Sequence, residues 1–166
     1  MSDVFAADKI KHRFVDKEVI GIIIGEDHED KLFRIYGEGV STQSGFARCY
    51  FNPTTQQYIV FELGEDKVLS GVAILDKKIE PQLEHCEAKS LNIDFLTGKK
   101  IKLGDPSEAI IQIYGYPEKR LQKKDGSIVF EYHTDSKHDS QVRLFYDSYL
   151  TFKNGTLVKI SIHDGN

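Results

Sequence analysis

The fold is decided by two stretches that align without a gap, Asp27-His28-Glu29-Asp30-Lys31-Leu32-Phe33-Arg34-Ile35-Tyr36-Gly37 and Asp105-Pro106-Ser107-Glu108-Ala109-Ile110-Ile111-Gln112-Ile113-Tyr114-Gly115. Each begins with an Asp that can cap a helix, carries an acid three residues later, and ends on a Gly that can terminate a helix. Apolar residues recur in each at the i, i+3, i+4 spacing of an amphipathic helix. The sequence therefore predicts two matched short helices, at 27–37 and 105–115, with Pro106 at the first helical position of the second.

Strand patterns follow each predicted helix. Apolar residues alternate with their neighbours at the period of two that is typical of a sheet with one buried face. Asn154-Gly155 and Asp125-Gly126 are strong hairpin signals, and Gly64-Glu65-Asp66 has a similar role in the first half. The residues predicted to face the core are Ala47, Cys49, Phe51, Ile59, Phe61, Leu63, Val72 and Ile74, then Ile128, Phe130, Tyr132, Leu150, Phe152, Ile160 and Ile162.

Because the order of helix and strands occurs twice, the sequence predicts an internal duplication. The expected fold class is α+β, with two tandem copies of a helix followed by an antiparallel β-meander and the helices on one face of the sheet. The first copy spans residues 18–75, the linker 76–96 and the second copy 97–162. We expect the two copies to share one core and to form one joint domain.

Composition excludes several classes of protein. The 166 residues are 40% apolar and carry a net charge of −4, which is typical of a soluble globular protein and unlike a nucleic-acid-binding one. The most apolar run, Val19 to Ile24, is far shorter than the ~20 residues of a membrane span. The sequence predicts no membrane insertion. No signal peptide is visible, so the chain is expected to be either cytoplasmic or a mature form whose leader has been removed.

The second copy resembles the repeat of the outer-membrane assembly lipoprotein family (SmpA/OmlA) and of the β-lactamase inhibitory protein. The resemblance covers about four-fifths of the chain and implies a tandem unit whose sheet face or loops engage another protein, in a periplasmic or secreted location. The first copy departs from the pattern at Glu38, where a Pro is expected. The matching residues are Ile101, Leu103, Gly104, Asp105, Glu108, Tyr114, Gly115, Pro117, Phe152, Gly155 and Ile160.

No group of residues has the spacing of a known catalytic or metal site. The loop from His133 to Asp139 gathers two His and two Asp, but a solvated loop explains them equally well. Glu84-His85-Cys86-Glu87 places Cys and His on opposite sides of an extended chain and offers no third partner. Cys49 is expected to be a buried free thiol, with a disulfide to Cys86 possible only in an oxidising compartment. The sequence therefore predicts no catalytic residue, no metal ligand and no cofactor.

Outward-facing tyrosines are the strongest candidates for function. Strand register predicts that Tyr50, Tyr58 and Tyr149 face away from the core, with Arg48 and Arg143 near them. Tyr and Arg are enriched at the centres of protein interfaces. The leading hypothesis is a non-enzymatic protein-binding module, of the inhibitor or envelope-assembly scaffold type, that uses this exposed sheet face. Two alternatives stay open: a small-ligand or metal-dependent enzyme with a site between the repeats, and a protein that self-associates through open sheet edges.

Overall fold

The computed structural model describes residues 16–41, 45–78, 89–137 and 143–165. Two helices and eleven strands are present in these ranges. Their order along the chain is β1 (Glu18–Val19), β2 (Ile22–Ile23), α1 (Glu29–Tyr36), β3 (Val40–Ser41), β4 (Ala47–Asn52), β5 (Gln57–Leu63), β6 (Leu69–Asp76), β7 (Lys89–Ser90), α2 (Ser107–Tyr114), β8 (Lys119–Gln122), β9 (Ile128–Lys137), β10 (Arg143–Lys153) and β11 (Thr156–Asp164).

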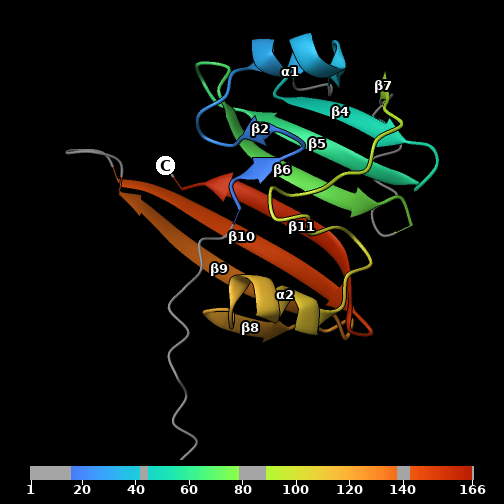
Figure 1. Cartoon of the computed structure of the whole chain (residues 1–166), viewed down its shortest axis with the longest axis vertical. Coiled ribbons are helices and arrows are strands. Elements are labelled where there is room, and N and C mark those ends of the chain that lie inside the picture. The colour runs from blue at the N-terminus through green and yellow to red at the C-terminus, as the bar shows by residue number, and fades with distance from the viewer. Residues whose placement is uncertain (1–15, 42–44, 79–88, 138–142, 166) are drawn as a thin grey trace, which may run out of the picture.

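One large sheet dominates the molecule (Figure 1). Its strands run in the order β3-β4-β5-β6-β11-β10-β9-β8, β7 joins β4 in parallel, and β1 and β2 form a separate small sheet. The predicted fold class is wrong, because the described part of the chain is mostly β, with 48% strand and 13% helix, and not two helix-strand repeats. Each helix has only eight residues. Most of the core therefore comes from a sheet that continues from one half of the chain into the other through the β6–β11 pair.

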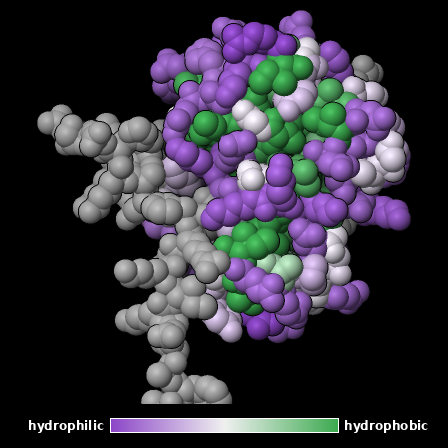
Figure 2. Space-filling view, viewed as in Figure 1, coloured by the Kyte–Doolittle hydropathy of each residue, from purple (hydrophilic) through white to green (hydrophobic). Residues whose placement is uncertain are grey.

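A single core lies on one face of this sheet. Side chains of α1, α2 and β2 and of the segment 91–105 belong to the same buried cluster as the inward residues of β4, β5, β6, β9, β10 and β11. Figure 1 shows the helices near opposite ends of the sheet, with β2 and the segment 91–105 between them. The same view in space-filling form shows two apolar areas divided by a band of hydrophilic side chains (Figure 2). We call the core side of the sheet the inner face and the opposite side the outer face.

Both predicted helices are confirmed, and each ends at the predicted Gly. Gly37 and Gly115 have φ values of 78° and 85°, and their N–H groups bond to the carbonyls of Phe33 and Ile111. A positive φ combined with an extended ψ, 169° at Gly37 and −174° at Gly115, is a backbone conformation that essentially only glycine adopts.

The predicted N-caps are wrong. His28 and Pro106 are the N-cap residues, and neither cap has a side-chain hydrogen bond. The carboxylates of Asp27 and Asp105 point back along the chain instead, where they accept the N–H groups of Ile23 at 2.7 Å and Lys102 at 3.0 Å. The two Asp side chains therefore fix the turns that lead into the helices.

The hairpins form where the sequence predicts them. Asn154 and Gly155, with φ of 51° and 74°, join β10 to β11. Two positive φ values in a two-residue loop suit the right-handed twist of the strands on either side. Asp125-Gly126 lies in the turn between β8 and β9, and 64–66 lies between β5 and β6.

The predicted orientation holds for most strands but is wrong for β4. Phe61, Ile74, Leu150 and Ile160 are all buried in the core, as predicted. In β4, by contrast, Tyr50 faces the core and Cys49 faces the opposite side, where it is also completely buried. Because β4 is buried on both faces at this point, its apolar alternation does not define which side is inner.

Candidate functional site

Two of the predicted binding residues lie on the inner face. Tyr50 is completely buried, donates a hydrogen bond from its hydroxyl to the carbonyl of Gly37 at 2.9 Å, and packs edge-on against Tyr36. Burial raises the pKa of Tyr50 to about 12. Arg48 pairs with Glu29 of α1 at 2.7 Å and lies over the ring of Phe33. The predicted outward orientation of this pair is therefore wrong, and both residues hold α1 against the sheet.

The other three predicted residues have different surroundings. Tyr58 faces outward as predicted, but it is only 8% exposed and packs against Phe51. Arg143 lies in β10 opposite Lys137, and its side chain is outside the described part of the structure. Tyr149 faces outward and is 37% exposed. Of the predicted tyrosines, Tyr149 alone presents a large open surface.

Tyr149 lies between two adjoining hollows on the outer face of the second half. Their volumes are about 220 and 350 Å³, and they share Tyr149 and Glu131. We refer to the two together as the outer-face groove. The first is lined by Glu118, Lys119, Glu131, Tyr132, His133, Asp147 and Tyr149. The second is lined by Leu121, Lys123, Val129, Glu131, Tyr149, Thr151, Lys159 and Ser161.

Strand register arranges this groove in rows that cross the sheet. Glu131 is opposite Lys119 of β8 and Tyr149 of β10, and Tyr149 is opposite Ser161 of β11. Two residues further along β9, a second row contains His133, Asp147 and His163. In the other direction, a third row contains Leu121, Val129, Thr151 and Lys159. The lining of the groove is therefore set by the pairing of β8 to β11.

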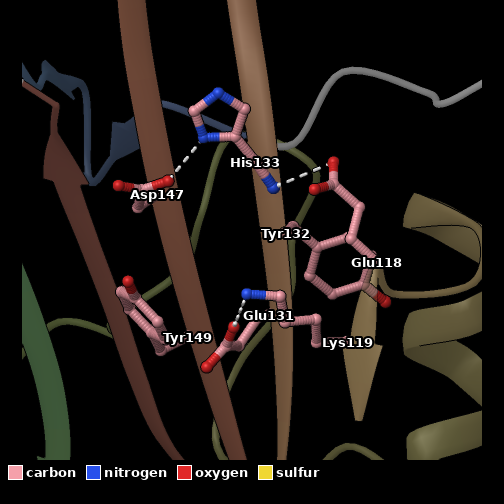
Figure 3. Close-up of a pocket in the computed structure, with 7 residues that line it drawn as sticks. All are labelled: Glu118, Lys119, Glu131, Tyr132, His133, Asp147 and Tyr149. Carbon is pink, nitrogen blue, oxygen red and sulfur yellow. Dashed lines mark hydrogen bonds and ion pairs between the residues drawn. The ribbon is translucent and has the colours of Figure 1, made fainter.

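Three carboxylates gather at one end of the groove. Figure 3 shows Asp147 and Tyr149 on one strand facing His133 and Glu131 on the next, with Glu118 and Lys119 beyond them. His133 Nδ1 lies 2.6 Å from Asp147 Oδ1, and Glu118 Oε1 accepts the backbone N–H of His133 at 3.3 Å.

The carboxylates affect the pKa of Tyr149, which lies at the centre of the groove. Partial burial raises the pKa of the Tyr149 hydroxyl, and the nearby negative charges of Asp147 and Glu131 raise it further. Lys119 Nζ lies 3.8 Å from Glu131 Oε2 and is itself largely exposed, so it forms a weak pair. With three carboxylates and one weakly paired lysine, this end of the groove has a negative electrostatic potential.

The row of His133 and Asp147 continues over the middle of the sheet. His163 Nδ1 lies 3.3 Å from Glu62 Oε2, across the intervening strand β6. The residue between them is Gly71, where an added Cβ would come within 2.8 Å of both side chains. The hydrogen bond that His163 Nδ1 donates to the Glu62 carboxylate raises the pKa of His163, and the same bond lowers the pKa of Glu62. The outer face thus carries two neighbouring His–carboxylate pairs.

Several other predicted features have a different place in the structure. His133 lies within strand β9 rather than in a loop, and 138–142 and the cluster 84–87 are outside the described residues. In the described ranges, no group of three or more His, Cys, Asp or Glu side chains could hold a metal ion. Over the same ranges, none of the helices has the length and apolar character needed to cross a bilayer.

The prediction of a free thiol at Cys49 is wrong. Cys49 is completely buried, as expected, but it is disulfide-bonded. The sequence holds one other cysteine, Cys86, which lies outside the described residues.

Sequence reasoning found Tyr149 but missed its neighbours. The alternation of β9 and β10 was sufficient to find them, because side chains two residues apart on a strand lie on the same face. Asp147 is two residues from Tyr149, and Glu131 and His133 follow Val129 at intervals of two. Lys159 and Lys119 required the pairing of β11 and β8, which no local pattern shows. Tyr149 and His133, which the sequence pattern assigned to a sheet face and to a loop, line the same hollow.

Comparisons with known proteins identify a fold and no family. No family model and no curated protein matches this sequence. The fold is similar to that of a DUF4309 family protein (YjgB) from Bacillus subtilis subsp. subtilis str. 168, with 15% identity and a TM-score of 0.51 over 88% of this chain and 84% of that chain. A second match is an extracellular protein containing a SCP domain from Bacillus anthracis str. Ames, with 13% identity and a TM-score of 0.46. The alignment covers 95% of this chain and 49% of that protein, about half of its length.

Proposed function

We propose that this protein is a non-enzymatic protein-binding module and that the outer-face groove around Tyr149 is its binding surface. The observation that carries the proposal is the position of Tyr149, a 37% exposed aromatic between two adjoining hollows. Tyrosine supplies apolar area and a hydrogen-bonding hydroxyl at a small cost in conformational entropy, so it is favoured at the centres of interfaces.

The size of the hollows also favours a protein partner. Sites that enclose a small ligand usually measure about 300–1,000 Å³ and bury most of the ligand. The two hollows of the groove lie open on a sheet face. One, of about 220 Å³, is below that range, and the other, of about 350 Å³, is near its lower end. They suit individual side chains of a partner better than a complete small molecule. An inhibitor or an envelope-assembly scaffold, as the sequence resemblance implies, would use such a face.

The disulfide of Cys49 supports a location outside the cytoplasm. Disulfides persist in oxidising compartments and are rare in the cytosol. A buried disulfide in a small mostly β domain is therefore consistent with a secreted or periplasmic protein.

The proposal predicts that Tyr149→Ala weakens partner binding and leaves the fold intact. We expect a loss of about 2 kcal/mol of binding free energy, the usual size for an interface hot spot. Stability should change by less than about 0.5 kcal/mol, because the side chain is on the surface. The measurement is affinity capture of partners from the source organism, followed by titration of the captured partner against each variant.

Tyr116→Ala is the matched control. Tyr116 is also an exposed tyrosine, at 68%, but it lies between α2 and β8 and does not line the groove. Equal binding by wild type and Tyr149→Ala, or equal losses in the two variants, would contradict the proposal.

A further inference from the structure

The outer-face groove has acidic side chains at one end and lysines at the other. We infer that its occupant is an extended segment of a partner protein. This segment has a basic side chain at one end, an acidic side chain at the other and apolar side chains between. The inference rests on the proposed function and specifies the chemistry of the partner at the same site.

The length of the groove suits a short stretch of extended chain. Its rows lie two residues apart along β9, so the rows at Val129 and His133 are separated by four residues. At ~3.3 Å per residue, this is about 13 Å. A segment of four to six extended residues would cover it.

The carboxylate end suits a guanidinium or ammonium group. Asp147, Glu131 and Glu118 line this hollow, and the aromatic side chain of Tyr149 lies beside them. A cation next to carboxylates and an aromatic ring gains from both charge pairing and the ring quadrupole. His133 Nδ1 already contacts Asp147 Oδ1, so the incoming cation would bind Asp147 beside the imidazole ring of His133.

The opposite end suits an acidic group. The second hollow contains Lys123 and Lys159 and, apart from the shared Glu131, no acidic residue. Leu121, 47% exposed, and Val129 form its apolar part beside Tyr149. An acidic side chain next to one or two apolar side chains would match this arrangement of charge and surface.

A second copy of this chain fits the groove less well than an extended segment. Both hollows are concave, so two such faces placed together would leave their hollows unfilled. A protruding strand or tail can place side chains into them.

Selection of peptides tests the inference. The probe is a displayed library of random ten-residue peptides, selected on the immobilised full chain and counter-selected on the Tyr149→Ala variant. We expect the enriched peptides to carry a base and an acid on opposite sides of an apolar centre. Peptides enriched without this charge order would overturn the inference and leave the binding face standing. Failure to enrich any peptide that depends on Tyr149, or a free protein that forms a Tyr149-dependent dimer, would overturn both.

A charge-reversal variant provides the second arm. In Lys123→Glu/Lys159→Glu both ends of the groove are acidic, so a bipolar peptide should bind about fivefold more weakly, the size expected from two exposed ion pairs. Selection on this variant should enrich peptides that are basic at both ends. The matched control is Lys78→Glu/Lys102→Glu, which makes the same change in net charge at two exposed lysines outside the groove. Equal losses in the two double variants would show that net charge alone governs binding, and the inference would fail.

Discussion

At the scale of single residues, the same tyrosine-to-glycine hydrogen bond recurs beside both helices. Tyr50 and Tyr132 each donate to the carbonyl of the Gly that ends a helix, Gly37 or Gly115, at 2.9 Å. These contacts explain why two tyrosines in strands face inward. A buried hydroxyl needs a partner, and the helix end supplies an acceptor. A tyrosine that alternates with apolar residues is therefore ambiguous until the position of the helix end is known.

The Asp residues before the helices give a prediction at this scale. Asp27 accepts two hydrogen bonds, from Ile23 N–H and from Lys31 Nζ at 2.6 Å, and is partly buried. Asp105 accepts a hydrogen bond from the exposed N–H of Lys102. We therefore expect Asp27→Ala to lower the free energy of unfolding by about 1–2 kcal/mol and Asp105→Ala by about 0.5–1 kcal/mol.

Urea denaturation of the two variants checks this order. If both Asp residues were N-caps, the opposite order would be expected, because Glu26 could replace the neighbouring Asp27 as the cap and Asp27→Ala would be the milder change. Glu26 is instead paired with Lys17. A larger loss for Asp105→Ala would contradict the turn-fixing role of Asp27.

At the scale of the elements, the sequence predicted the helices and hairpins better than the sheet. Gly37, Gly115 and Asn154-Gly155 act through their own backbone conformation, so their effect is visible locally. The pairing of β6 with β11 joins residues more than 80 positions apart, such as Ile74 and Ile160. An edge-to-edge junction of the two halves follows from the idea of a duplication, but nothing in either strand specifies the other, so this particular pairing could not be predicted from local patterns. For the same reason Tyr149 could be found from the sequence, but its neighbour Lys159 could not.

The Glu62–His163 pair, which links β5 to β11 across β6, predicts how the stability of the fold depends on pH. The raised pKa of His163 means that its contribution to stability is complete below the ordinary value of 6.5 and is lost as the pH rises through the raised value. The lowered pKa of Glu62 means that its contribution is present above the ordinary value of 4.5 and is lost as the pH falls through the lowered value. The pair should therefore stabilise the fold most between about pH 4.5 and 6.5.

The test compares wild type with Glu62→Gln in denaturant at pH 5.5 and pH 8.5. Both side chains are substantially exposed, so we expect a difference below about 1 kcal/mol at pH 5.5 and a smaller one at pH 8.5. The other charged groups that act on His163 are Asp164 and Asp147, and the variant leaves them in place. A difference that grows towards pH 8.5 would contradict the assigned sign.

At the scale of the whole molecule, the disulfide of Cys49 crosslinks a strand that is buried on both faces. We expect reduction to lower the free energy of unfolding by about 2–4 kcal/mol, the usual range for a disulfide. Alkylation in denaturant without reductant should leave both cysteines of the chain unmodified, and reduction should make both reactive. Thiols that react before reduction would contradict the crosslink and remove its support for an oxidising compartment.

We propose that partners bind the outer-face groove and not the face of the sheet that carries the helices. Site-specific photo-crosslinking in the source organism tests this claim most directly. A photoreactive phenylalanine derivative replaces Tyr149 in one variant and Tyr116 in the other, and adducts are identified by mass spectrometry. We expect a discrete protein adduct from position 149 and none of the same identity from position 116. No adduct at position 149, or the same adduct at both positions, would contradict the claim.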